Sequence, residues 1–266
     1  MHKNSIYHFL QKHGWDIMAI VSLILIFVIF FARLFYPHVS VFYIPDSVNS
    51  DVFHVNLSQK IYLSEILKSG HLPFITQDIA NGFPLLGESQ IGAISIFNLL
   101  LYRFLDPIIA FNLTYLLGFI FMGLFLYLLG KHLYQNRFLA YILAISYSFS
   151  GIVIMKLTHQ GILQSVFLIP VVLYFYIRGI GNFNIRSALI AGFFCGQQFL
   201  FGHFFIATGT SINILIMFLY SYITNNKDRR SEFLYFGLFT LSTILVSLPQ
   251  LVQSYIFYAH SARSAA

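Results

Sequence analysis

The sequence contains few charged residues and a single cysteine. Charged residues make up 9% of the chain, against roughly 25% in ordinary soluble domains. Hydrophobic residues make up 58% and aromatic residues 18%, so too little charge is present to cover the surface of a soluble protein. Cys195 alone cannot build a disulfide scaffold. These shortages exclude a soluble enzyme and a disulfide-rich domain, and they favour an all-α, polytopic transmembrane helical bundle.

The usual motifs of soluble enzymes are also missing. The chain has no G-x-x-x-x-G-K-[ST], no G-x-G-x-x-G after a strand, no H-E-x-x-H and no G-x-S-x-G. Cys195 lies in an apolar run beside Gly196, where packing is a better interpretation than nucleophilic chemistry. The formal net charge is +6, but no run of Lys and Arg and no basic helix face accompanies it, so we expect no nucleic-acid partner.

Seven apolar runs approach the roughly 20 residues needed to cross a bilayer. The first follows a polar start with Lys3 and Lys12, is too long for a signal-peptide core and has no cleavage site after it, so we expect an uncleaved anchor. No repeat or soluble domain interrupts the chain, which predicts one transmembrane domain over residues 1–266. The predicted spans are Ile17–Tyr36, Ile108–Leu129, Phe138–Met155, Ile162–Ile177, Ser187–Gly202, Phe204–Ile223 and Phe233–Ile256.

The distribution of charge predicts the orientation of these spans. With the N-terminus in the cytoplasm, nine of the 15 Lys and Arg residues fall in short cytoplasmic segments, as the positive-inside rule requires. We therefore expect a cell-membrane protein whose functional face is extracytoplasmic. The nine residues are Lys3, Lys12, Lys131, Arg137, Arg178, Arg186, Lys227, Arg229 and Arg230.

One outer segment is much longer than the other connections. It runs from about Pro37 to Pro107 and carries most of the acidic residues, and long loops of this kind are often functional. Apolar residues at Phe53, Leu57 and Ile61 predict an amphipathic helix over Val52–Lys68 that lies in the interface plane, on the membrane or on the bundle. Ile91–Phe104 is a second apolar stretch, which we interpret as another interfacial or re-entrant helix.

Odd-numbered spans end at the outer face, so polar residues at their ends should gather beneath this loop. Polar groups near hydrocarbon are costly and often mark functional sites. The candidate residues are Asp46 and Asp51 in the loop, Lys156 and His159 after the third span, Gln198 and His203 after the fifth, and Arg263 after the seventh.

Each candidate also has a structural interpretation. Asp51 could stabilise the positive end of a helix, and the two histidines could be interfacial turn residues. Gln198 could hold helices together, and Lys156 and Arg263 could extend towards lipid headgroups. Their shared depth and side, rather than any single residue, favour a site.

Several short motifs, in order along the chain, resemble the YfhO-like bacterial membrane proteins of the GT-C glycosyltransferase superfamily. The family pattern is an Asp that opens an amphipathic helix, an S-G-x-L-P ending, a G-x-P-L turn and an N-L-L entry to the next span. The matching segments are Asp51, Ser69–Pro73, Asn81–Leu86, Ile91-Gly92, Phe97–Leu100, Phe149–Gly151 with Thr158–Gln160, Pro170, Gly202-His203 and Leu248–Arg263.

The chain departs from this family in three respects. Phe74–Asp78 replaces the usual Trp-Asn-Pro, and His203 is followed by Phe204-Phe205 rather than by Pro-Gln. Family members are much longer, so the resemblance covers only their N-terminal half and implies a truncated product or a fragment.

The resemblance implies a GT-C-like fold and an enzyme of the outer face. Such an enzyme moves a sugar from a polyprenyl-phosphate carrier to a cell-envelope polymer or lipid acceptor. It needs a general base for the acceptor hydroxyl and cations for the departing phosphate. On this hypothesis Asp51 is the base, Asp46 is a second carboxylate, and Lys156, His159, Gln198, His203 and Arg263 bind the substrates. The two carboxylates would suit a divalent metal ion, although no ligand spacing demands one.

The main rival is a non-enzymatic membrane protein, either a flippase subunit for lipid or polymer or an assembly scaffold. A transporter would favour matched broken helices and polar groups at mid-membrane depth, whereas this sequence places its polar groups at one face. A scaffold would tolerate Asp51→Asn without loss of function, and an enzyme would not.

Overall fold

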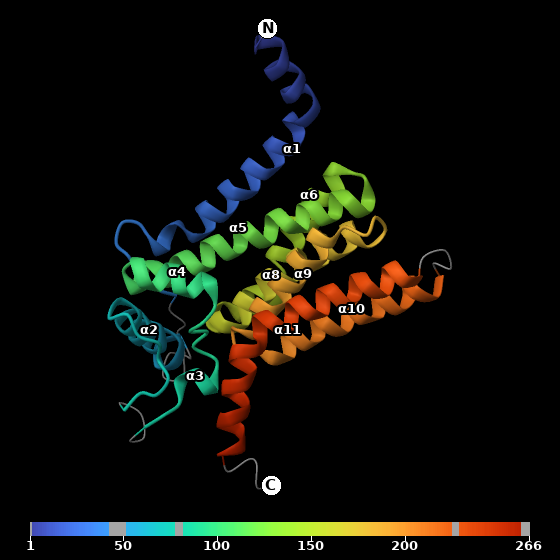
Figure 1. The fold of residues 1–266 in the computed structure, drawn as a ribbon. Helices are drawn as coiled ribbons and strands as arrows, with labels where there is room; N and C mark the ends of the chain where they lie inside the picture. Colours follow the sequence, from blue (N-terminus) through green and yellow to red (C-terminus); the bar gives the residue numbers. More distant parts are fainter. Residues whose placement is uncertain (1, 43–51, 78–81, 225–228, 262–266) are drawn as a thin grey trace.

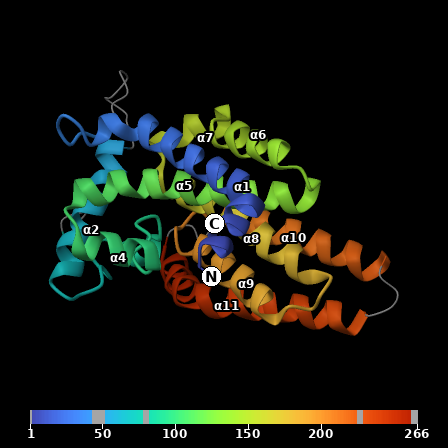
Figure 2. The ribbon, with the colours of Figure 1, turned by 90° about the horizontal axis from the view of Figure 1, so that it is seen from above.

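The computed structural model describes residues 2–42, 52–77, 82–224 and 229–261, with side chains from Gly14 onward. Within these ranges all regular elements are helical, apart from one isolated bridge between Thr76 and Phe83. The long helices lie side by side, and the short helices α2, α3 and α4 gather at one end of the bundle (Figure 1). The view from above shows α2 and α4 at this same end (Figure 2). The elements are α1 (His2–Phe31), η1 (Ala32–Leu34), η3 (Val52–Leu57), α2 (Ser58–Lys68), α3 (Leu85–Glu88), α4 (Ile96–Phe104), α5 (Pro107–Tyr134), α6 (Arg137–Ser148), α7 (Gly151–Met155), η4 (Lys156–Thr158), α8 (Gln160–Ile180), α9 (Ile185–Phe199), α10 (Phe204–Thr224) and α11 (Arg229–Ala259).

Six stretches within the described ranges are long and apolar enough to cross a bilayer, which confirms a multi-pass helical membrane bundle at this level. The fifth predicted span corresponds to α9, which has 15 residues and falls short of the roughly 20 that a crossing requires. Seven spans and a GT-C-like arrangement therefore stay predictions. The six stretches are Gly14–Leu34, Pro107–Tyr134, Arg137–Thr158, Gln160–Ile180, Phe204–Thr224 and Arg229–Ala259.

Hydrogen bonds at the two ends of the bundle fix the directions of its helices. At the end that carries α2, α3 and α4, here called the loop end, Asn112 Nδ2 at the start of α5 donates to Leu34 O (3.0 Å) after α1. At the opposite end, here called the far end, Lys131 Nζ near the end of α5 lies 2.7 Å from Asp16 Oδ2 of α1. The helices α1 and α5 are therefore antiparallel.

The helices α5 and α8 run in the same direction with a constant register. Gln160 Nε2 of α8 donates to Phe111 O of α5 (3.0 Å), and the rings of Tyr174 and Phe125 lie 5.7 Å apart. Between these pairs, a Cβ on Gly118 would overlap the ring of Phe167. Glycine at this position lets α8 approach α5 closely. Because the two helices run in the same direction, the first turn of α8 lies at the loop end beside the start of α5.

Aromatic side chains fill the space between α1, α5 and α8. The ring of Phe119 lies 4.9 Å from that of Phe31 and 5.4 Å from that of Phe167, in edge-to-face arrangements. Such pairs contribute about 0.5–1.5 kcal/mol beyond the burial of their area. The ring of Phe119 on α5 therefore contacts aromatic rings of both α1 and α8, and part of the high aromatic content of the sequence serves to pack these three helices.

The helix predicted over Val52–Lys68 is present as η3 and α2. Its buried face differs from the predicted stripe, because Phe53, Leu57 and Ile61 are only half-buried. The fully buried positions are Val52, Lys60, Leu63, Ser64 and Leu67.

A polar contact with α4 explains the change of face. Ser64 Oγ donates to Tyr102 O (2.8 Å) at the contact of α2 with α4, so a polar position turns inward. The helix α2 therefore packs on other helices of the loop end.

The second predicted helix is shorter than expected, since α4 begins at Ile96 rather than at Ile91.

Candidate functional site

A group of basic side chains, namely Lys60, Lys156, His159 and His203, lies at the loop end near the start of α8. Lys156 is the first residue of the turn η4, and His159 follows this turn and directly precedes α8. Tyr115 of α5 fixes this turn by donating its hydroxyl to Leu157 O (2.9 Å). The turn is also bonded to the loop helix, because Asn56 Nδ2 donates to Thr158 O (3.4 Å).

His203 reaches the same place from the turn between α9 and α10. A Cβ on Gly161, in the first turn of α8, would lie 2.8 Å from His203 Nε2. Burial lowers the pKa of His203 to about 4, and the nearby His159, Lys60 and Lys156 lower it further in the same direction. The imidazole is therefore neutral at pH 7. The structure thus brings together Lys156, His159 and His203, three of the residues predicted from the sequence.

The turn that carries His203 is held by a close backbone contact. Gly202 has φ +79°, and a Cβ there would lie 2.5 Å from the carbonyl carbon of Ser89. Any side chain at residue 202 would push the segment after α3 away from His203. The neighbouring Glu88 is half-buried, and its burial raises the pKa of its carboxyl group.

Lys60 was not predicted as a site residue, and it is the most unusual group at this end. It is fully buried, its Nζ donates to Ile91 O (2.7 Å), and the amine lies 5.3 Å from the centre of the Tyr102 ring. No carboxylate among the described residues forms an ion pair with it. Burial lowers the pKa of Lys60 to about 7. Its spacing from Leu63, Ser64 and Leu67 was the available signal, because i, i+3, i+4 and i+7 share one helix face.

Buried polar side chains join α4 to α8 next to these basic residues. Tyr102 donates its hydroxyl to Gln160 Oε1 (3.3 Å), and Gln164 Nε2 donates to Asn98 Oδ1 (2.6 Å). Gln164 Oε1 is buried without a hydrogen-bond partner in the part of the chain that the structure describes. These bonds join α4 to the first two turns of α8.

Gln198 makes a bond between helices. It is fully buried, and its Nε2 donates to Ser165 O of α8 (2.8 Å) while Ser165 Oγ donates back to Gln198 O (3.3 Å). This geometry favours the interpretation that Gln198 holds α9 on α8. Gln197 holds α9 to α4 in the same way, because its Oε1 accepts a hydrogen bond from Ile96 N (3.2 Å) at the start of α4.

Asp46, Asp51 and Arg263 lie outside the residues that the structure describes, as does Asp78. Their predicted roles stay predictions. Val52, which follows Asp51 in the sequence, is fully buried in one apolar cluster with Val153 and Ile162. Within the described ranges, no three His, Cys, Asp or Glu side chains gather closely enough to hold a metal ion.

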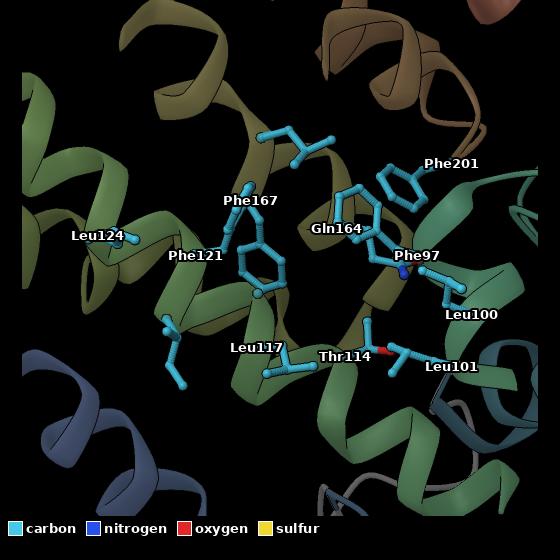
Figure 3. Close-up of a pocket in the computed structure, with 13 residues that line it drawn as sticks. Phe97, Leu100, Leu101, Thr114, Leu117, Phe121, Leu124, Gln164, Phe167 and Phe201 are labelled. Carbon is cyan, nitrogen blue, oxygen red and sulfur yellow. The ribbon is translucent and has the colours of Figure 1, made fainter. Parts of the chain in front are cut away.

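An apolar pocket of about 340 Å³ lies further along α8, where Gln164 and Phe167 line it. Figure 3 shows the rings of Phe97, Phe167 and Phe201 around it, with Gln164 and Thr114 among the lining residues. Leu100 and Leu117, which also line it, are 57% and 47% exposed on the surface of the bundle. The pocket therefore reaches the lateral surface, which faces hydrocarbon in a bilayer.

The first turn and a half of α8 serves both features. His159 precedes the helix, Gly161 lies against His203, and Gln164 borders the pocket. From His159 to Gln164 the helix rises about 7–8 Å. The positive end of the α8 dipole points towards the same place. The arrangement can hold an anionic group next to a hydrocarbon chain.

Comparisons with protein-family models, with curated proteins and with solved structures gave no match to this chain.

Proposed function

We propose that this chain is a membrane glycosyltransferase of the GT-C type. It takes a sugar from a polyprenyl-phosphate-linked donor at the extracytoplasmic face and transfers it to a cell-envelope polymer or lipid. The observation that carries this proposal is that basic side chains at the start of α8 lie about one and a half helical turns from an apolar pocket that opens laterally. A lipid-linked sugar has the same two parts, a phosphate and a long hydrocarbon chain.

The donor would enter the pocket from the bilayer. Its first isoprenoid units would lie among Phe97, Phe167 and Leu117, which are apolar lining residues. Its phosphate would lie at the start of α8, near Lys156 and His159. Charge develops on the phosphate as the bond to the sugar breaks, and fixed cations and helix dipoles stabilise that charge without reorganising.

The acceptor would approach from the outer loop. A carboxylate must remove the proton of its hydroxyl, and we assign this role to Asp51 and a supporting role to Asp46. The helix that follows Asp51 supports the assignment, because Asn56 of η3 bonds to Thr158 beside His159. His203, neutral at pH 7, offers a hydrogen bond to donor or acceptor rather than a charge.

Turnover of a lipid-linked sugar by the purified chain in vesicles tests this proposal. The substrate is a radiolabelled polyprenyl-phosphate hexose or pentose, and a cell-envelope fraction supplies the acceptor. Asp51→Asn preserves size but cannot accept a proton, so turnover should fall at least ~10²-fold with little change in melting temperature.

Asp106→Asn is the matched control for that variant. Asp106 is also an outer acidic residue, and its Oδ1 accepts from Ile108 N (2.9 Å) to cap α5. Asn caps helices nearly as well, so Asp106→Asn should keep full turnover. Normal turnover by a folded Asp51→Asn protein would overturn the assignment of Asp51 as the base and transfer that role to Asp46 or Asp78. Absence of turnover by the folded wild-type chain would instead favour the scaffold interpretation.

A further inference from the structure

The far end of the bundle carries a second polar cluster, separate from the loop end. Asp16 of α1 is almost fully buried, and it accepts a hydrogen bond from Tyr127 (2.6 Å). Lys131 Nζ lies 2.7 Å from its Oδ2, and Arg137 Nε lies 3.3 Å from its Oδ1. One carboxylate thus faces two cations, which leaves this cluster with an excess of positive charge.

The start of α6 adds to this excess. The helix α6 begins at Arg137, with Asn136 as its cap, so the positive end of the helix dipole lies at the same place. An anion is the ligand that such a place attracts.

An open groove of about 550 Å³ between α1 and α6 adjoins the cluster. Trp15, Met18 and Phe138 line it with apolar surface, and Arg137 borders it. Trp15 and Phe138 are 69% and 70% exposed. Further along, the hydroxyl groups of Ser22 and Tyr141 bond to each other (3.0 Å), and the rise from Trp15 to Ser22 is about 10 Å.

We propose that this groove binds one anionic phospholipid. Its phosphate lies against Arg137 at the positively charged end, and one acyl chain lies along Met18 and Phe138 between α1 and α6. Charge complementarity selects the headgroup, and the apolar groove accepts a chain of any common phospholipid. This site lies at the far end and does not depend on the proposed glycosyl transfer.

Trp15 allows a direct test, because it is the one tryptophan of the chain and it lines the groove. The protein is reconstituted in phosphatidylcholine vesicles with increasing fractions of a phospholipid brominated near the carboxyl end of its chains. Bromine quenches Trp15 fluorescence on contact. Brominated phosphatidylglycerol should reach half-quenching at about fivefold lower mole fraction than brominated phosphatidylcholine, the factor for about one cation near a lipid phosphate.

Variants separate charge from structure in the same assay. Arg137→Gln should remove most of the preference, while Arg137→Lys should retain most of it. Both variants should fold, because Lys131 and Tyr127 still bind Asp16. Arg178→Gln, at an exposed cation of α8 that bonds to Tyr174, is the control and should keep the full preference.

Three results would overturn the proposal. Equal quenching by both lipids in the wild-type protein would show that the headgroup is not recognised. An unchanged preference in Arg137→Gln would place recognition elsewhere. Absence of quenching by either lipid, together with a dimer in chemical cross-linking, would show that a second copy covers the groove.

Discussion

Lys60 shows how one residue can carry a strong dependence on pH at the loop end. Burial lowers its pKa to about 7, whereas an unfolded chain keeps a lysine near 10.4. Between these values the unfolded state binds more protons than the folded state. The free energy of unfolding should therefore rise with pH from about 7 to about 10, by at most about 1.4 kcal/mol per pH unit. Below pH 7 the full cost of burying the charged amine is present.

Replacing Lys60 with methionine tests this dependence. Lys60→Met keeps the length of the side chain and removes the charge, so it should raise the melting temperature at pH 6 and change it little at pH 10. Circular dichroism of the protein in detergent measures both temperatures. Lys68→Met, at the exposed end of the same helix, is the control. An equal effect of Lys60→Met at both pH values would contradict the buried, neutral amine.

The candidate residues show which part of a site can be predicted from a sequence. Lys156, His159 and His203 could be grouped because topology alone places the ends of alternate spans at one face. Lys60 could not be recognised, because its burial depends on Ile91 and Tyr102, which are distant in sequence. Gln198 was predicted to bind substrate, yet its hydrogen-bonding partner on α8 became visible only in the structure.

At the scale of elements, hydropathy located the long helices well, and periodicity located the helix over Val52–Lys68. The direction of its buried face was wrong in part for a physical reason. Apolar periodicity measures affinity for hydrocarbon, but Ser64 and Lys60 are buried because main-chain carbonyls accept their hydrogen bonds. A sequence does not reveal carbonyl groups supplied by distant residues.

Truncation of one apolar residue distinguishes the two faces of that helix. Leu63 is fully buried against α4 and the segment around Leu85, so Leu63→Ala should cost about 2–4 kcal/mol. The loss should appear as local opening, seen as at least tenfold faster tryptic cleavage at the exposed Lys68. Ile61→Ala, on the half-buried stripe, should accelerate cleavage only a few fold. Equal effects would restore the face predicted from the sequence.

At the scale of the whole molecule, the number of spans depends on α9. Its end lies at the loop end, where Gln197 accepts from Ile96 N. Its start lies at the turn after α8, where Asn184 N donates to Gly179 O. If α9 crosses the bilayer despite its 15 residues, then α11 must finish on the same side as the outer loop. The contact of Ser254 Oγ with Gly87 O (2.9 Å) of α3 supports this arrangement.

Labelling of single introduced cysteines with an impermeant reagent tests orientation and span count together. Ser69, His260, Gln135 and Asn182 are all exposed, and the native Cys195 is buried and should not react. With an outward-facing loop end and seven crossings, Ser69→Cys and His260→Cys are labelled in intact cells. Gln135→Cys and Asn182→Cys are labelled only after permeabilisation, because the positive-inside rule places them in the cytoplasm.

Each departure from this pattern has one structural meaning. Labelling of Gln135→Cys and Asn182→Cys in intact cells, with Ser69→Cys protected, would show the opposite orientation in the membrane. The candidate site would then lie on the cytoplasmic side. A donor whose sugar faces outward could not then reach Lys156 or His159. Labelling of Ser69→Cys with protection of His260→Cys would instead leave α9 as a helix that does not cross. The contacts of α11 with α3 would then have to break in the membrane, since they require the end of α11 and the outer loop to share one side.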